Sequence, residues 1–389
     1  MIKFEEAYKI VIKTAKSIGT ERISYLNSIN RILAEDVKSD IEMPPFNKAA
    51  VDGYACKQED LDSQIEIIEV VQAGQTPSKK VEKGQCTHIM TGAPVPEGAD
   101  CIVMVEYSVV NGNKVSFTRK QSKTNISYRA EDVKLEQTVL TKGKLIKPQH
   151  IAIFASVGYI DVLVSKQVKV GVISTGDELV EPHEKPGLSK IRNSNGHQIT
   201  AQVNAMGVIA KNYGIAKDTY EDTLRIVTKA LEENDVIMLS GGVSVGEFDF
   251  VAEVLQNAGV EILFDSVAVT PGKPTTFGKS KNKFCFGLPG NPVSSFVQFE
   301  LMAKPFLYKM MDYNFNPTEI KMPMAHEITR KRTERRAYIP VNIINGEIKR
   351  IEYHGSGHIH ALSHADGLIA FPQGVNTIKK GEIINVRQI

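Results

Sequence analysis

The sequence predicts a multidomain α/β protein with a central doubly wound, mostly parallel sheet and smaller β-rich parts. Between residues 168 and 315, short apolar runs alternate with segments of helical spacing, the pattern of a sheet covered by helices on both faces. Residues 44–140 and 316–389 hold short β-branched runs separated by Gly, Pro and Asn turns. At roughly 100 to 200 residues per domain, 389 residues leave room for several domains.

We therefore divide the chain into four parts. Apolar residues recur every three or four positions from Ile2 to Ile32, which predicts a leading helix, and helical spacing returns in the segment that begins at Lys147. The expected parts are an N-terminal helical linker region (1–43 plus 141–167), a β-rich insertion domain (44–140), an α/β core domain (168–315) and a C-terminal β-barrel domain (316–389).

Composition excludes several classes of protein. Hydrophobic residues make up 42% and charged residues 24% of the chain, which is typical of globular proteins and not of disordered ones. A net charge of +2 is too small to indicate nucleic-acid or anionic-membrane binding. The start lacks a signal peptide and no apolar stretch could span a membrane, so we expect a cytoplasmic protein. Four scattered cysteines support neither a disulfide framework nor a zinc knuckle.

Polar loops follow the predicted strands of the core domain, where ligands of such sheets bind. The first loop, Ser174–Leu179, places Asp177 and Glu178 at a sheet edge, and carboxylates there suit Mg²⁺. The alternative is a capping Asp with a solvated Glu. Asp218, after the next strand, is another carboxylate at a strand end and could equally be a helix cap.

The second loop, Ser240–Asp249, is rich in glycine, which lets the backbone approach an anion closely at a helix start. Its glycine spacing matches neither a dinucleotide fingerprint nor a Walker loop. We expect anion binding here, with a tight turn as the alternative. Asp249 could hold a metal ion that bridges to the anion, or it could cap the next helix.

Two stiff turns complete the expected pocket. The loop Leu288–Ser294 carries Pro289, Gly290, Asn291 and Pro292, and it is read either as a pocket wall or as a plain helix start. The turn before it presents Lys273, either as a point charge for an oxyanion or as a solvated lysine.

The insertion holds two further Pro- and Gly-rich loops. Pro44–Ala55 contains Asp52, which could accept hydrogen bonds from a substrate or from its own turn. Met90–Asp100 contains Thr91, whose hydroxyl could donate to an anion.

Two other patterns carry no predicted chemistry. The basic run Arg330–Arg336 is short and lacks interleaved aromatic residues, so we read it as a solvated strand. The spacing of His354, His358, His360 and His364 matches no zinc pattern, so we expect no metal site there.

Taken in order, the motifs resemble those of the molybdopterin molybdenumtransferases, the MoeA-type enzymes of molybdenum cofactor synthesis, a family also represented by the C-terminal part of gephyrin. The resemblance spans nearly the whole chain. It is carried by PPFNKAAVDGYA (44–55), MTGAPVPEGAD (90–100), RAEDV (129–133), STGDEL (174–179), SGGVSVGEFD (240–249), PGKPTTFG (271–278) and LPGNPVSS (288–295).

The resemblance implies Mg²⁺-dependent insertion of molybdate into adenylylated molybdopterin, with release of AMP. It also implies a core related to the molybdopterin adenylyltransferases of MoaB and MogA type, a homodimer, and contact with such an adenylyltransferase. The implied catalytic residues are Glu178, Asp249, Asp218 and Asp132, of which Glu178 and Asp249 would hold the metal. The implied substrate-binding residues are Asp52, Thr91, Ser240, Gly241, Gly242, Ser244, Lys273, Pro289, Gly290, Asn291 and Pro292.

The chain departs from the family pattern at Asn47, Lys48 and Ala49, and at Thr270, where many relatives have Lys. The missing cation predicts a weaker oxyanion site, and the choice between molybdate and tungstate stays open. The alternative functions are a molybdopterin adenylyltransferase-like activity of the same core and a non-catalytic scaffold.

Overall fold

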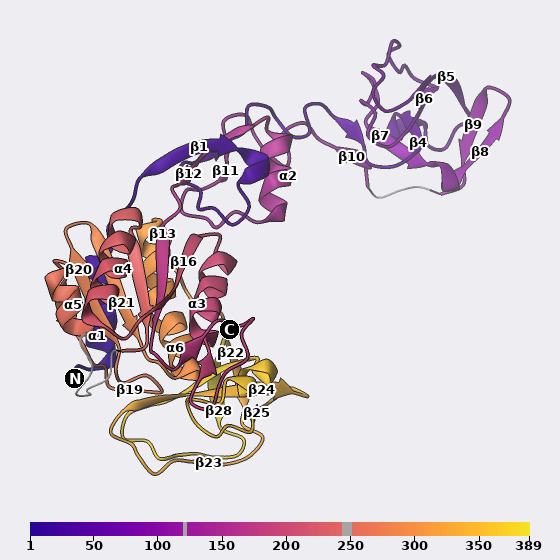
Figure 1. The fold of residues 1–389 in the computed structure, drawn as a ribbon. Coiled ribbons are helices and arrows are strands. Elements are labelled where there is room, and N and C mark those ends of the chain that lie inside the picture. The colour runs from indigo at the N-terminus through magenta and orange to yellow at the C-terminus, as the bar shows by residue number, and fades with distance from the viewer. Residues whose placement is uncertain (120–122, 243–250) are drawn as a thin grey trace. The chain divides into compact units, whose positions relative to one another are not determined.

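The computed structural model describes residues 1–119, 123–242 and 251–389 (Figure 1). The chain divides into two compact units, each with its own sheets and hydrophobic clusters. The first unit holds residues 1–34, 143–147 and 161–389, and the second holds residues 35–142 and 148–160. In the described part of the chain, every helix is too short or too polar to cross a membrane.

Six strands of the first unit form its central sheet, in the order β16-β13-β17-β21-β20-β18. They are β13 (Lys169–Thr175), β16 (Ile209–Ala216), β17 (Val236–Ser240), β18 (Glu261–Phe264), β20 (Thr276–Ser280) and β21 (Lys283–Leu288). Neighbours from β16 to β21 run parallel, whereas β20 is antiparallel to both of its neighbours. The expected mostly parallel sheet is confirmed.

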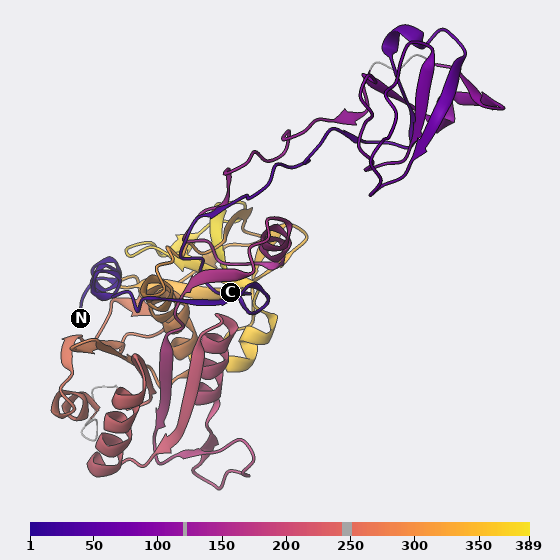
Figure 2. The same cartoon turned by 90° about the horizontal axis from the view of Figure 1, so that it is seen from above.

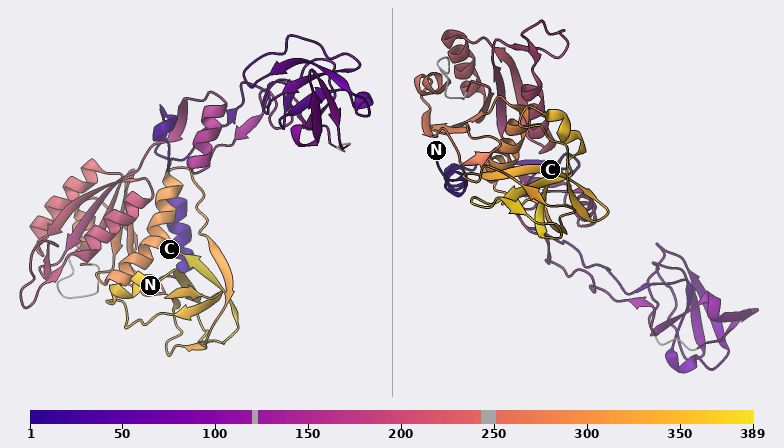
Figure 3. Two further views of the ribbon diagram at one scale, coloured as in Figure 1. Left: turned by 90° about the vertical axis from the view of Figure 1, so that its right-hand side faces the viewer. Right: turned by 90° about the horizontal axis from the view of Figure 1, so that it is seen from below.

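Helices cover both faces of this sheet because its strands are apolar on both sides. In β17, Val236 and Met238 belong to one hydrophobic cluster, while Ile237 and Leu239 belong to the other. The first face packs against α1 (Phe4–Thr14), α3 (Ser194–Ala205), α6 (Pro292–Gln298), the π-helical turn η4 (Phe299–Ala303) and α7 (Lys304–Met310). The second face packs against α4 (Tyr220–Glu233) and α5 (Val251–Asn257). Figure 3 shows α1 beside the helix that runs from α6 into α7.

The leading helix is shorter than the apolar spacing suggested. It ends at Thr14, and Gly19, with a φ of 83°, precedes β1 (Thr20–Ser24). This strand pairs antiparallel with β12 (Asp161–Ser165), so long-range pairing decides the conformation of a segment with helix-like spacing.

The C-terminal strands close into a barrel. Strands β24, β26, β28 and β22 pair in this order, and β25 pairs with the other edge of β24. A bridge between Met324 and Ile348 joins the end of β22 to β25 and completes the ring. The bounds are β19 (Val269–Thr270), β22 (Glu319–Pro323), β23 (Ile328–Thr329), β24 (Arg336–Ile344), β25 (Glu347–Arg350), η5 (Ile359–His364), β26 (Gly367–Phe371), β27 (Thr377–Ile378) and β28 (Ile383–Gln388).

The second unit contains the six-stranded insertion sheet, β7-β4-β6-β5-β9-β8 (Figure 2). Its strands are β4 (Gly53–Cys56), β5 (Ile65–Val71), β6 (Gln85–Ile89), β7 (Cys101–Met104), β8 (Ser108–Asn111) and β9 (Lys114–Phe117). Shorter elements of the chain are η1 (Tyr25–Asn27), β2 (Val37–Lys38), β3 (Lys48–Ala49), η2 (Gln58–Asp60), η3 (Val105–Tyr107), β10 (Ile126–Ser127), β11 (Thr138–Leu140), α2 (Pro148–Ser156), β14 (Leu179–Val180) and β15 (Ile191–Arg192).

Three cysteines form a row across the insertion sheet. Cys56 lies opposite Cys101 in the β4–β7 pair, and the register of β4 with β6 places it opposite Cys86 as well. All three are buried in one hydrophobic cluster, and the Sγ atoms of Cys56 and Cys101 are 3.7 Å apart. The fourth cysteine, Cys285, is buried in β21 of the core.

Candidate functional site

A pocket of about 430 Å³ lies at the carboxyl ends of the parallel strands β13, β17 and β21. Six of the residues predicted from the loops line it: Glu178, Ser240, Gly241, Gly290, Asn291 and Pro292. The other lining residues are Thr175, Leu179, Ile191, Arg192, Asn193, Ser194, Asn195, Gly357, Ile359 and His360. The three predicted loops thus share one pocket.

The glycine loop after β17 packs tightly on the end of β13. Gly241 and Gly242 have φ angles of 94° and 61°, the left-handed region that favours glycine. A Cβ atom at Gly241 would lie 2.5 Å from the carbonyl oxygen of Thr175. The glycines therefore allow the close approach of two strand ends that forms this wall of the pocket.

Asn195 connects the wall to the start of α3. Its Nδ2 donates to Ser240 Oγ at 2.7 Å and to the Gly290 carbonyl oxygen at 2.8 Å. Asn193 caps the same helix, because its Oδ1 accepts from the Gly196 N–H at 3.1 Å. One helix start therefore holds the loops after β17 and β21 in place.

Two buried side chains on the pocket have an unpaired polar atom. Thr175 is 3% exposed and Asn193 is 1% exposed. Neither Thr175 Oγ1 nor Asn193 Nδ2 finds a hydrogen-bond partner in the described structure. Buried polar atoms are usually paired, and a polar ligand in the pocket could pair with these two.

Glu178 lines the pocket, and two further carboxylates, Asp177 and Asp218, lie near it in the chain or at the next strand end. A Cβ atom at Gly176 would lie 2.3 Å from Glu178 Oε2, so glycine makes room for the Glu178 carboxylate. The Asp218 N–H donates to Asp177 Oδ1 at 3.0 Å. Burial, and then the Asp177 carboxylate, raise the pKa of Asp218 above its ordinary value. Asp218 does not line the pocket, but it follows β16, the neighbour of β13.

The described lining of the pocket contains one carboxylate, that of Glu178, which could hold a metal ion. No group of three or more His, Cys, Asp or Glu side chains could hold a metal within residues 1–119, 123–242 and 251–389. Mg²⁺ needs only one or two protein carboxylates and completes its shell with water and phosphate oxygens. Glu178 on the pocket wall meets that requirement.

The C-terminal barrel contributes one wall of the pocket. The Val293 N–H at the start of α6 donates to the carbonyl oxygen of Ser356 at 3.0 Å. This bond places the segment that leads into η5 beside the pocket, which Gly357 and the first two residues of η5, Ile359 and His360, line. The sequence does not predict these pocket residues, because nothing in a Gly- and His-rich turn indicates which distant loop it contacts.

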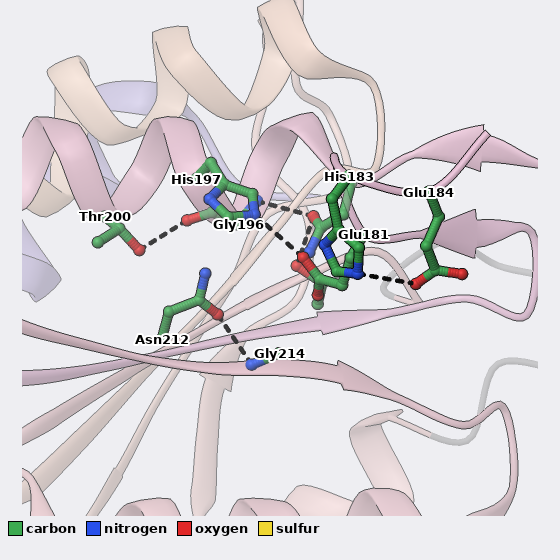
Figure 4. Close-up of polar contacts among 10 residues, drawn as sticks. Glu181, His183, Glu184, Gly196, His197, Thr200, Asn212 and Gly214 are labelled. Atoms are coloured by element: carbon green, nitrogen blue, oxygen red, sulfur yellow. Dashed lines mark hydrogen bonds and ion pairs between the residues drawn. The ribbon is translucent and has the colours of Figure 1, made fainter. Parts of the chain in front are cut away.

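A connection from β14 to α3 borders the site (Figure 4). His197 Nε2 on α3 lies 3.1 Å from Glu181 Oε2, and His183 Nε2 lies 4.0 Å from Glu184 Oε1 (Figure 4). The parallel pairing of β14 with β15 adds to these contacts. The His197–Glu181 contact and the β14–β15 pairing link this connection to α3 and to the strands that carry Leu179 and Arg192, whereas the His183–Glu184 contact joins only sequence neighbours.

Lys273 and Pro289 are predicted site residues that do not line the pocket. Pro289 is buried, and Lys273 is exposed in the loop before β20. That loop lies at the carboxyl edge of the sheet, since β20 runs antiparallel to β21. Gln298 of α6 donates to the Pro271 carbonyl oxygen at 3.0 Å and fixes the turn.

In the second unit, the structure joins Asp52 to Thr91. Asp52 Oδ1 accepts hydrogen bonds from the Thr91 hydroxyl and from the Thr91 N–H, both at 2.6 Å. The hydroxyl, followed by the N–H, holds the pKa of Asp52 below its ordinary value. Asp132 is exposed, and its N–H donates to the Met43 carbonyl oxygen at 3.0 Å.

Two predicted residues, Ser244 and Asp249, lie outside the described residues. A second pocket, of about 520 Å³, runs along the outer face of α4. Its described lining comes from α4 alone, so it lacks the convergence of several strand ends found in the first pocket.

Three family models match successive parts of the chain. They are the MoeA N-terminal region (domain I and II) at residues 2–158, the probable molybdopterin binding domain at 171–309, and the MoeA C-terminal region (domain IV) at 321–389.

Relatives match over nearly the full length. A molybdopterin molybdenumtransferase of Staphylococcus epidermidis is 36% identical over 406 residues, covering 99% of this chain and 95% of that protein. One of Staphylococcus aureus is 32% identical with the same coverage. A crystal structure of the molybdopterin biosynthesis MoeA protein of Pyrococcus horikoshii matches all of both chains with a TM-score of 0.87 and 28% identity. The chain therefore belongs to the MoeA-type molybdopterin molybdenumtransferase family, a family of transferases in molybdenum cofactor biosynthesis.

Proposed function

We propose that this chain inserts molybdate into adenylylated molybdopterin, with release of AMP and in a Mg²⁺-dependent reaction. The observation that carries the proposal is the pocket at the ends of β13, β17 and β21, in a chain that belongs to this family. The start of α3, which lines this pocket, suits a phosphate-bearing ligand, because a helix N-terminus favours an anion.

Residues of the chain have distinct roles in this proposal. Asn195 holds the loops after β17 and β21 in the geometry that receives the ligand. Glu178 would hold Mg²⁺ together with Asp249, and the ion would neutralise charge on the phosphate oxygens. Asp52 and Thr91 belong to the insertion, and we assign them a role in substrate binding.

The test is a reconstitution with purified components. The chain is incubated with adenylylated molybdopterin, molybdate and Mg²⁺, and the product is scored by reactivation of an apo-molybdoenzyme. AMP release is measured in parallel. Reactivation that requires molybdate and the chain supports the proposal, and its absence with active substrate contradicts it.

The same assay separates the two alternatives. An adenylyltransferase would consume molybdopterin and ATP and form the adenylylated intermediate. A scaffold would support neither reaction. If the chain were a scaffold, Glu178→Gln would not change its binding to partner proteins. We favour the molybdenumtransferase because the full-length relatives carry that name and because Glu178, the expected metal ligand, lines the pocket.

A further inference from the structure

Four histidines in one short segment, His354, His358, His360 and His364, do not form a metal site in the described structure. Two of them pair with each other. The rings of His354 and His358 stack at 4.8 Å between centroids, and His354 Nε2 lies 3.0 Å from Glu352 Oε1. His360 differs from this pair because it lines the core pocket.

The backbone around His360 is fixed against the pocket. Besides the bond from Val293 to Ser356, the Ile359 N–H donates to the Gly357 carbonyl oxygen at 3.0 Å. Ser363 Oγ donates to the His360 carbonyl oxygen at 2.7 Å within η5. The Val293–Ser356 bond joins this segment to the start of α6, and the two local bonds shape the short helix η5 that carries His360.

The pocket surface that His360 joins is rich in hydrogen-bond donors. Ser194 and Asn195 line it from the first turn of α3, a helix of 12 residues whose N-terminus favours an anion. Asn193 adds a buried Nδ2 that has no partner in the described structure. Arg192 and Glu178 are the Arg, Lys, Asp or Glu side chains among the described lining residues.

We propose that His360 is an anion-binding residue of this pocket, which donates a hydrogen bond to a phosphate oxygen of the ligand. The inference rests on the proposed function and deepens it, because it names a group of the C-terminal barrel that recognises the phosphate part of the substrate. An imidazole N–H suits this task whether the ring is neutral or charged, since one ring nitrogen always carries a proton.

The test compares two probes on three variants. Calorimetry measures the affinity of the full chain for inorganic pyrophosphate and for adenosine, which lacks phosphate. A hydrogen bond to a charged group is stronger than one between neutral groups, so His360→Ala should weaken pyrophosphate binding by roughly tenfold or more. His360→Gln, which keeps an N–H donor, should recover part of the loss. His364→Ala, on the same helix but outside the pocket lining, is the matched control and should bind as wild type does.

The outcomes are distinct. Unchanged pyrophosphate affinity in His360→Ala, or no pyrophosphate binding by the wild type, overturns the inference. An equal loss for pyrophosphate and adenosine also overturns it, because that result indicates a packing role. Thermal unfolding of each variant checks that the fold is intact. If wild type makes cofactor while His360→Ala binds pyrophosphate normally, only this inference fails. If pyrophosphate binding depends on His360 but no cofactor forms, only the proposed function fails.

Discussion

Glu178 is the residue on which the proposed chemistry most directly depends. We expect Glu178→Gln to fold normally, since the side chain is exposed, and to lower turnover by roughly 10² or more, the scale of losing a main electrostatic stabiliser. The measurement is cofactor formation at saturating Mg²⁺. Glu184→Gln is the control, because its carboxylate lies near His183 and outside the pocket lining. Near-normal turnover in Glu178→Gln would contradict the proposed role of Glu178 in holding Mg²⁺.

The Asp52–Thr91 contact predicts a measurable pKa change. Thr91→Val removes the hydroxyl that contributes most to the lowered pKa of Asp52, so that pKa should rise toward its ordinary value. A lowered carboxyl pKa means that the contact stabilises the folded insertion above the ordinary pKa, and that this stabilisation is lost as pH falls through the folded-state pKa. Carbon-detected NMR titration of Asp52 measures the shift.

A control variant isolates the hydroxyl contact. Thr87→Val also removes a threonine hydroxyl from the insertion sheet, but Thr87 Oγ1 has no partner in the described structure. The pKa of Asp52 should stay as in wild type in this variant. An identical Asp52 titration in wild type and Thr91→Val would contradict the predicted hydrogen bond.

Some site residues could be predicted from their neighbours in the sequence, whereas others are recognised only by contacts that form on folding. Ser240, Gly241 and Asn291 follow apolar strands and sit among Gly and Pro, so sequence order alone placed them at one sheet edge. Asn195 was missed because a single Asn near a helix start is indistinguishable from a cap. Its contacts with two loops, the farther one 95 residues away, exist only after folding.

At the scale of elements, the start of α3 holds the ends of β17 and β21 through Asn195. Asn195→Ala would leave Ser240 Oγ and the Gly290 carbonyl oxygen without this donor. We expect a loss of about 1–3 kcal/mol in the free energy of unfolding, together with weaker ligand binding. Denaturant unfolding measures the loss. Asn204→Ala, on the exposed surface near the other end of α3, should change stability little. Equal free energies of unfolding for Asn195→Ala and Asn204→Ala would contradict the role of Asn195 in holding the two strand ends.

The secondary-structure predictions are wrong where a segment pairs with a distant strand in spite of its local sequence pattern. Helical spacing after Thr14 gives way to β1 because β12 offers a partner strand. The alternating pattern of strands and helices also did not predict β20. This strand lies between β18 and β21 in the sheet and is antiparallel to both. Two residues, Lys281 and Asn282, separate β20 from β21, and they are not one of the Asn-Gly or Asp-Gly pairs that mark a hairpin turn in a sequence.

For the whole molecule, the family resemblance predicts a homodimer. Light scattering coupled to size exclusion should give a mass about twice the 42.9 kDa of one chain, and the value should not change over a tenfold dilution in the micromolar range. Molybdopterin adenylyltransferase can be added in the same experiment to test the expected contact. A stable mass of one chain at all concentrations would contradict the dimer.

The three buried cysteines of the insertion sheet can report its unfolding, because their thiols become reactive when the sheet opens. Burial raises the pKa of Cys86 to about 12 and that of Cys285 above its ordinary value, while the hydrogen bond with Cys101, and then burial, raise that of Cys56. Thiols react as thiolates, so a water-soluble maleimide should label the native chain very slowly. As urea is raised, three thiols should become reactive together when the insertion sheet opens, and Cys285 should follow the core separately. Mass spectrometry counts the maleimides added per chain at each urea concentration, and so shows at which concentration each unit opens. Simultaneous labelling of all four cysteines would show that the two units unfold together.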